Sequence, residues 1–319
     1  MSTKTSPTST AAARPVALIA GPTASGKSAT ALGLAEALDK AGRKAVIVNA
    51  DSMQVYADIP VLAASPSEEE QKQVEHRLYG AWDGAEPCSA ADWAARAKAE
   101  IADCHEKEAV PILVGGTGMY LRVLIEGIAP IPEIDAEVRE VVRSMETATA
   151  YAALQIEDPL RAAELEPGDS QRISRALEVK RSTGVTLGDW QLAKTGGIGD
   201  EVDLHPLVHM PPRQWVYERC DTRFAAMMES GAVEEVEALL ARDLSPDLPV
   251  MRAIGVPEIA AFLREESTRG EAIAAGAQAT RNYAKRQFTW LRNQSPPDWP
   301  RIESENIDIK SVFASLLQL

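Results

Sequence analysis

Short apolar runs alternate with amphipathic stretches over the first 130 residues of the chain. Runs of the length of buried strands occupy residues 16–20, 45–49 and 110–114, and each is followed by a helical pattern. These helices are expected at 27–40, 67–74 and 90–108. Alternation of this kind predicts an α/β fold with a parallel sheet flanked by helices.

The pattern changes after Pro130-Ile-Pro132, where helical periodicity runs through residues 135–145 and 169–182 until Thr195-Gly-Gly-Ile-Gly199 interrupts it. We expect residues 131–200 to form a helical insertion. Residues 204–210 read as a strand that returns to the sheet. A helical C-terminal part follows, with helices at 213–229, 232–242, 256–265 and 271–292. Residues 15–130 and 201–319 are therefore assigned to one core.

Composition narrows the class of protein. Of 319 residues, 45% are hydrophobic, which is enough to bury a core, and no apolar stretch of 18 residues indicates a membrane helix. Residues 1–14 are polar and free of acids, so we expect a disordered tail, with an organelle transit peptide as the alternative. The three cysteines lie far apart, which argues against a disulfide framework or a zinc site and favours the cytoplasm.

The net charge and the local charges of the chain indicate different partners. The net charge of −14 argues against bulk affinity for nucleic acid. Two segments nevertheless carry a local excess of basic residues, at 171–181 and 281–301. From the residues alone these are either solvated helix faces or phosphate contacts. In the second segment Tyr283, Gln287 and Trp290 share one helix face, whereas Arg281, Lys285 and Arg292 share the opposite face, with Phe288 beside it.

The first apolar run leads directly into a phosphate-binding motif. The residues fit G-x-x-x-x-G-K-[ST] at every defined position, between a strand pattern and a helix pattern. Such a loop wraps backbone N–H groups around a di- or triphosphate at a helix N-terminus. Lys27 would reach the terminal phosphates and Ser28 would hold Mg²⁺. The motif comprises Gly21, Pro22, Thr23, Ala24, Ser25, Gly26, Lys27 and Ser28.

Other polar groups follow the next two strands. Asp51 comes after the second strand, where it could bind Mg²⁺ or water, act as a general base, or cap a helix. The third strand ends in Gly115-Gly-Thr-Gly118, a turn that suits either an anion or a helix cap. Arg219 and Arg223 lie four residues apart, as in an anion clamp or in ordinary pairing with acids.

Together the motifs resemble those of the bacterial tRNA dimethylallyltransferases, also called tRNA isopentenyltransferases. The blocks GPTASGKS, NADSMQVY, HRLYG, SAADW and PILVGGTGMYLR occur in the order and spacing of that family. The likeness continues with DAEVR, DSQRISRALEV, RFAAMMESGAVEEV, RAIGVPE and YAKRQFTWLRN. It covers about residues 15–295 and is far more specific than a phosphate loop alone.

The resemblance implies a P-loop NTPase-like core and a defined reaction. A dimethylallyl group would pass from dimethylallyl diphosphate to N6 of the adenosine 3′ of the anticodon, in tRNAs that read codons starting with U. Asp51 would be the base, Thr117 and Arg223 would orient the diphosphate, and residues 23–28 would cradle it with Mg²⁺ at Ser28. The implied tRNA contacts are Asp51, Ser52, Met53, Gln54, Thr117, Arg139, Gln171, Arg172, Ile173, Ser174, Arg175, Arg252, Lys285 and Arg286. The family also suggests a monomer without an obligate protein partner or membrane.

The chain departs from the family in places. Ser65 stands where many relatives have a basic residue, Glu75 replaces a proline, and Val256-Pro257 replaces Tyr-Arg. We expect tRNA affinity to depend more on Arg172, Arg175, Lys285 and Arg286.

Three alternative functions stay open: an adenylate isopentenyltransferase acting on free AMP, ADP or ATP, a small-molecule kinase, and a non-catalytic RNA-binding module. The helical insertion and the basic C-terminal helix favour tRNA, since a mononucleotide needs neither.

Overall fold

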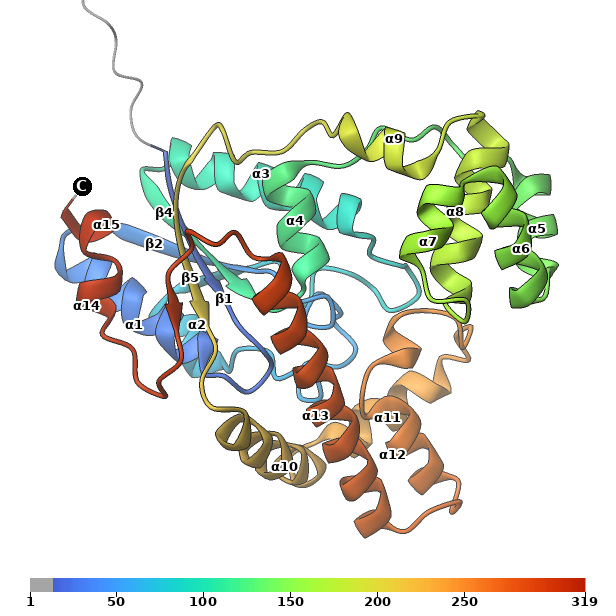
Figure 1. Ribbon diagram of the computed structural model, residues 1–319. Helices are drawn as coiled ribbons and strands as arrows, with labels where there is room; N and C mark the ends of the chain where they lie inside the picture. Colours follow the sequence, from blue (N-terminus) through green and yellow to red (C-terminus); the bar gives the residue numbers. More distant parts are fainter. Residues whose placement is uncertain (1–13, 319) are drawn as a thin grey trace, which may run out of the picture. The chain divides into compact units, whose positions relative to one another are not determined.

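A parallel sheet forms the centre of the computed structural model, which describes residues 14–318 (Figure 1). The strand order is β3-β2-β4-β1-β5-β6, and every neighbouring pair is parallel. All carboxyl ends therefore meet at one edge, where ligands bind in folds of this kind. The strands are β1 (Pro15–Ala20), β2 (Lys44–Asn49), β3 (Glu75–Arg77), β4 (Ala109–Gly115), β5 (Asp203–His209) and β6 (Arg301–Ile302).

Helices cover the sheet because its central strands are apolar on both sides. Every residue of β1 and β4 is buried. One face packs against α1 (Lys27–Lys40), α14 (Ile309–Val312) and α15 (Ala314–Gln318), with Leu34 and Phe313 in the shared core. Helix α3 (Ala90–Glu106) packs on β2 and β4 and begins at a capping box formed by Ser89 and Asp92. The shorter helices are α2 (Glu68–Gln73) and α4 (Gly118–Glu126).

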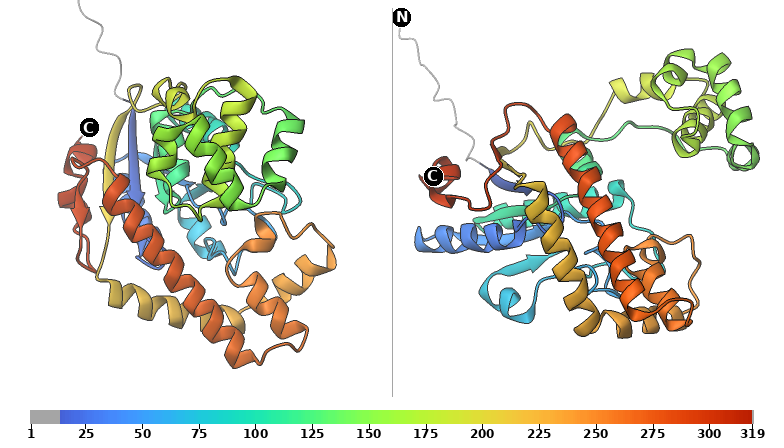
Figure 2. Two further views of the ribbon diagram at one scale, coloured as in Figure 1. Left: turned by 45° about the vertical axis from the view of Figure 1, so that its right-hand side comes forward. Right: turned by 60° about the horizontal axis from the view of Figure 1, so that its bottom comes forward.

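The C-terminal helices pack around a long helix, α13 (Arg269–Gln294). It lies side by side with α10 (Arg213–Glu229) (Figure 2). Small residues at intervals of four, Ala272, Gly276, Thr280 and Ala284, are buried along α13 and allow this close approach. The remaining elements of this part are α11 (Ala232–Ala241), the 3₁₀ turn η1 (Val250–Arg252) and α12 (Val256–Leu263).

The chain divides into two compact units, Ile125–Ile198 and the rest. The Ile125–Ile198 unit is helical and has a core of its own, built around Leu154, Ile173 and Leu177. Its two connecting segments are paired, because Ile128 and Thr195 exchange both backbone hydrogen bonds at 3.0 Å. Its helices are α5 (Ala136–Ser144), α6 (Thr147–Glu157), α7 (Pro159–Glu164), α8 (Ser170–Thr183) and α9 (Leu187–Leu192).

The predicted α/β fold with a parallel P-loop-type core is confirmed, and the four predicted strands are present. Strands β3 and β6 and helices α6, α7, α9, α14 and α15 were not predicted. Phe288, which was placed beside the basic face, is buried, and Arg281 of that face pairs with Asp221. The expected tail lies outside the described residues, apart from Arg14, whose carbonyl accepts from the N–H of Asp203. No described helix is long and apolar enough to cross a membrane.

Candidate active site

The loop between β1 and α1 has the backbone that a phosphate site requires. Gly26 is the N-cap of α1 with φ of +93°, a left-handed conformation that glycine adopts without strain. The free N–H groups of the first turn therefore face the loop. The ammonium of Lys27 donates to the carbonyl of Pro22 at 2.7 Å. Burial lowers the pKa of Lys27 to about 8, against the opposing effect of the Asp51 carboxylate.

A glutamine from the far end of the chain holds this loop in place. The N–H of Thr23 donates to Oε1 of Gln287 at 2.7 Å, and Nε2 of Gln287 donates to the carbonyl of Gly116 at 3.1 Å. Helix α13 thus connects the phosphate loop to the turn after β4. Periodicity placed Gln287 on the inward face, but its partners lie 264 and 171 residues away and gave no sequence signal.

The glycines after β4 are needed for close packing. A Cβ at Gly115 would lie 2.0 Å from the carbonyl oxygen of Ala50, and one at Gly116 would lie 2.5 Å from that of Gly21. Both contacts are impossible for a larger residue. The turn therefore brings the segments after β1, β2 and β4 together, a role that neither sequence alternative, anion binding or a helix cap, had included.

Asp51 is fixed by the segment around it. The side chain of Asn49 accepts from the N–H of Asp51 at 2.8 Å and donates to its carbonyl at 3.0 Å. One carboxylate oxygen of Asp51 accepts from the N–H of Met53 at 3.0 Å. Among the described residues Asp51 forms no salt bridge and caps no helix, so the helix-cap alternative is wrong.

Thr117 supports the same segment. Its hydroxyl accepts from the N–H of Ser52 at 2.9 Å and lies 3.3 Å from the Ser52 hydroxyl. Tyr283 lies beside these two hydroxyls, and burial raises its pKa. Thr117 does not line the cavity described below. Its observed contacts position the residues that follow Asp51.

Two arginines of α10 face the phosphate loop. Nε of Arg219 donates to the carbonyl of Ala24 at 2.9 Å, and Arg223 donates to the hydroxyl of Thr23. Within residues 14–318 neither forms a salt bridge, so the pairing with acids that the sequence left open is not observed. Burial lowers the pKa of Arg223. Arg219 is exposed, and its guanidinium lies 4.5 Å from the ring centre of Trp215. The enclosed guanidinium of Arg223, which has no acidic partner beside the phosphate loop, favours an anion as its missing partner.

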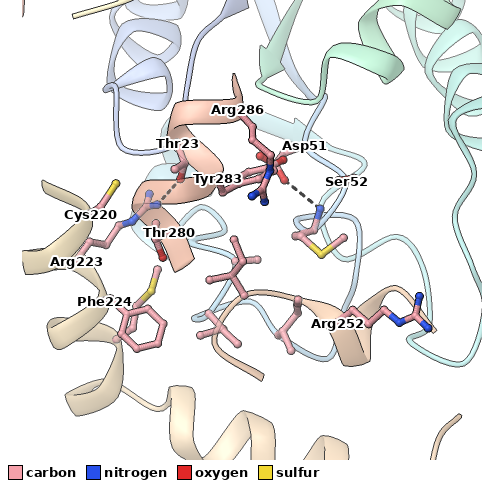
Figure 3. A pocket seen from close by; sticks show the side chains of 17 residues that line it. Thr23, Asp51, Ser52, Cys220, Arg223, Phe224, Arg252, Thr280, Tyr283 and Arg286 are labelled. Atoms are coloured by element: carbon pink, nitrogen blue, oxygen red, sulfur yellow. Dashed lines mark hydrogen bonds between the residues drawn. The ribbon is translucent and has the colours of Figure 1, made fainter. Parts of the chain in front are cut away.

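A cavity of about 230 Å³ joins these groups. Arg223 and Thr23 lie on one side of it and Asp51 and Tyr283 on another (Figure 3). An apolar wall closes the remainder and includes Ile59, Leu62, Ala63, Phe224, Met227 and Ile254. The cavity therefore combines an anion site, a carboxylate and room for a small apolar group.

Some predicted tRNA contacts lie at this cavity. Ser52, Met53, Arg252 and Arg286 line it. The Arg252 guanidinium is exposed, pairs with Asp247 and points away from the carboxylate (Figure 3). Arg286 lies 5.5 Å from the ring centre of Tyr283, and Lys285 is exposed. Gln54 donates to the carbonyls of Ala63 and Ala64, so its amide nitrogen holds a loop.

The other predicted tRNA contacts belong to the helical unit. Gln171, Arg172 and Arg175 are exposed, and Ser174 and Arg139 are partly exposed. Arg172 pairs with Asp169 at 2.9 Å, and Arg175 lies 3.7 Å from the carboxylate of Glu178. Ile173 is fully buried in the core of the unit, so its side chain is structural and its assignment as a tRNA contact is corrected.

The expected magnesium ion would have few protein ligands. No group of three or more His, Cys, Asp or Glu within the described residues could hold a metal. Ser28, in the first turn of α1, presents an exposed hydroxyl. One hydroxyl fits Mg²⁺, which keeps several waters and binds largely through substrate phosphates.

The fold and the cavity define an α/β P-loop protein whose phosphate-binding motif borders a small cavity with an apolar wall. Residues 54–294 match the profile of the family described as IPP transferase. The chain belongs to the IPP transferase family.

Named relatives extend this match over most of the chain. The tRNA dimethylallyltransferase of Erythrobacter litoralis (strain HTCC2594) is 62% identical over 304 residues, covering 95% of this chain and 96% of that protein. The full-length tRNA isopentenylpyrophosphate transferase of Bacillus halodurans has a similar structure, with a TM-score of 0.66, 29% identity, and 95% and 94% coverage. A eukaryotic dimethylallyltransferase acting on tRNA gives a TM-score of 0.78 at 25% identity, over 95% of this chain and 77% of that one.

Proposed function

We propose that this enzyme is a tRNA dimethylallyltransferase. It transfers a dimethylallyl group from dimethylallyl diphosphate to N6 of the adenosine 3′ of the anticodon, in tRNAs that read codons starting with U, and releases diphosphate. Family membership and the activity named for the relatives support the reaction. The observation that carries the proposal for the site is the placement of Asp51 and unpaired Arg223 around one cavity with an apolar wall.

The anion site suits the leaving group of this reaction. Breaking the allylic C–O bond leaves negative charge on the diphosphate. In the proposal the backbone N–H groups of the loop, Lys27 and Arg223 receive that charge, and Arg219 holds the loop backbone from behind. The hydroxyl of Ser25, which is buried without a hydrogen-bond partner, gives the loop a further donor. Mg²⁺ held at Ser28 would neutralise part of the diphosphate charge when bound.

Asp51 suits the acceptor side. An adenine amine is a poor nucleophile, so a carboxylate that accepts its proton during attack lowers the barrier. One oxygen of Asp51 is held by the N–H of Met53, which leaves the other to face the amine. The adenine must leave its stack to reach a cavity of this size, as in other enzymes that act on bases. Tyr283 provides an aromatic surface beside the carboxylate.

The acceptor is tRNA and not a free nucleotide. The exposed basic residues of the helical unit and of α13 contact its phosphates. The enzyme acts as a monomer in the cytoplasm. The second candidate is transfer to free AMP, ADP or ATP, which needs the same donor site but not the helical unit.

Incubation with labelled dimethylallyl diphosphate distinguishes transfer to tRNA from transfer to a free nucleotide. We expect label in tRNA and none in AMP or ATP. Asp51→Asn should lower turnover by orders of magnitude while tRNA still binds, and Asp39→Asn, at an exposed position on α1, is the control. Label in AMP but not in tRNA would establish the second candidate, and transfer at the normal rate by Asp51→Asn would remove the assigned base.

A further inference from the structure

We propose that the ring of Phe224 forms the end wall of the cavity and restricts the donor to a chain of dimethylallyl length. This inference rests on the proposed function, because it concerns which prenyl diphosphate the same site accepts. Phe224 follows Arg223 directly on α10, and both side chains line the cavity (Figure 3).

The positions of the polar groups indicate the direction in which the donor chain extends. Its diphosphate would be held where Thr23 and Arg223 meet, and Asp51 marks the side from which the amine approaches. Among the apolar residues of the wall, Phe224 and Met227 follow Arg223 on the same helix, and Leu62 lies with Phe224 against Gly255. A prenyl group whose diphosphate occupies the loop therefore extends toward Phe224.

The ring of Phe224 cannot move back to admit a longer chain. A Cβ at Gly276 would lie 2.0 Å from Cζ of Phe224, and one at Gly255 would lie 3.0 Å from Cε2. The tip of the ring thus rests against the backbone of two glycines, on α13 and at the start of α12. Neither glycine lines the cavity, so both lie behind the ring. Phe224 is only 3% exposed.

Because the ring rests against these two glycines, mutation can make the cavity either deeper or shallower. Removing the ring joins its volume to the cavity and exposes the glycine backbone as a new, deeper end. Adding a methyl group at Gly276 has the opposite effect, because the ring must shift toward the cavity. The carbonyl of Gly276 is already bound by the hydroxyl of Thr280 at 2.7 Å, which limits movement of the helix backbone.

The test compares two donors, dimethylallyl diphosphate and geranyl diphosphate, by kcat/KM with a tRNA anticodon stem-loop and by mass of the prenylated adenosine. We expect the wild type to use dimethylallyl diphosphate strongly over geranyl diphosphate. Phe224→Ala should shift the ratio toward geranyl by about tenfold or more, since one or two methylenes already discriminate by such factors. Phe224→Leu, which keeps a buried apolar side chain, should shift it in the same direction and provides the test if the alanine variant does not fold.

Two further variants sharpen the test. Phe288→Ala removes the same ring from a buried site on α13 that does not line the cavity, and should leave the donor ratio unchanged. Gly276→Ala should raise KM for dimethylallyl diphosphate, and combining it with Phe224→Leu should restore that KM. An unchanged ratio in folded Phe224 variants, or a wild type that uses geranyl diphosphate equally well, overturns the inference alone. Absence of transfer from either donor by the wild type overturns the proposed function instead.

Discussion

Lys27 shows how a single residue can serve binding at the expense of stability. Its ammonium is enclosed before any anion is bound, and burial lowers its pKa from 10.5 to about 8. The folded protein therefore disfavours the charged form. The lowered pKa reduces the free energy of unfolding by about 3 kcal/mol. This loss is present in full below pH 8 and disappears as pH rises toward the pKa of the lysine in the unfolded chain.

Lys27→Met should therefore abolish prenyl transfer and raise the free energy of unfolding. We expect a gain of about 1–3 kcal/mol at pH 7 in urea, and less at pH 10, where the wild-type lysine is neutral in the folded state. The control is Lys40→Met on the same helix, where the lysine is exposed and pairs with Glu36. A loss of stability in Lys27→Met equal to that in the control would contradict the assignment of a costly buried charge.

The same titration predicts how donor binding depends on pH. The charged ammonium attracts diphosphate, so KM for dimethylallyl diphosphate should rise as pH increases above about 8. Initial rates between pH 6 and 10 at saturating tRNA would measure it. A KM for the donor that stays flat through this range would argue against direct contact between Lys27 and the diphosphate.

Gln287 is the residue on which the loop geometry most depends. Gln287→Ala leaves the N–H of Thr23 and the carbonyl of Gly116 without their partner, at a cost of about 1–3 kcal/mol for each unsatisfied group. We expect a higher KM for the donor with little change in tRNA affinity, measured by steady-state kinetics and by filter binding. Gln278→Ala on the same helix, where the side chain is exposed, should change neither.

At the scale of elements, the loop before α2 is held from outside the sheet. The carboxylate of Glu235 on α11 accepts from the N–H groups of Val61 and Leu62 at 2.6 and 2.9 Å. Burial raises the pKa of Glu235, and the two N–H groups oppose that rise. Leu62 lines the cavity, so α11 holds one part of the apolar wall in place through the hydrogen bonds of Glu235.

Glu235→Ala should therefore loosen this wall. Two N–H groups lose their acceptor, so we expect a loss of about 1–3 kcal/mol in the free energy of unfolding and a weaker preference for the correct donor. Thermal denaturation and the donor ratio in kcat/KM measure the two effects. Glu237→Ala, at an exposed position two residues further along α11, is the matched control. Equal effects of the two substitutions would show that the contact with the loop does not shape the cavity.

Elements with strong periodicity could be predicted from the sequence, and contacts between distant elements could not. Helices α1 and α10 begin and end where predicted because their apolar spacing and flanking residues are clear. Strand β3 has only the polar residues Glu75-His-Arg77 and forms because β2 provides an open edge. The sequence showed glycines after β4, but only the fold shows that they are required by the backbones of Ala50 and Gly21.

At the scale of the whole molecule, the charge distribution and the separate helical unit indicate that different parts of the chain serve tRNA binding and prenyl transfer. The chain carries a net charge of −14, so attraction to tRNA must come from local groups. Arg172 and Arg175 are exposed residues of α8. The ion pair of Arg172 with Asp169 lies at the surface, so it is weak and can be exchanged for a phosphate, whereas Arg175 lies 3.7 Å from the buried carboxylate of Glu178, which also pairs with Arg143. The helical unit Ile125–Ile198 has its own core, and its connecting segments are hydrogen bonded to one another at Ile128 and Thr195.

These connections predict that the helical unit can be removed without unfolding the remainder. Because Ile128 and Thr195 are already paired, a short Asn-Gly turn can replace residues 129–194 and close the two segments as a hairpin. We expect the shortened protein to unfold cooperatively and to bind dimethylallyl diphosphate with wild-type affinity, measured by calorimetry. Its tRNA affinity should fall by at least tenfold at low salt, with a shallower dependence on salt concentration as phosphate contacts are lost. Retained tRNA affinity would assign recognition to the core and to α13, and a loss of donor binding in the folded protein would show that the helical unit contributes to the donor site.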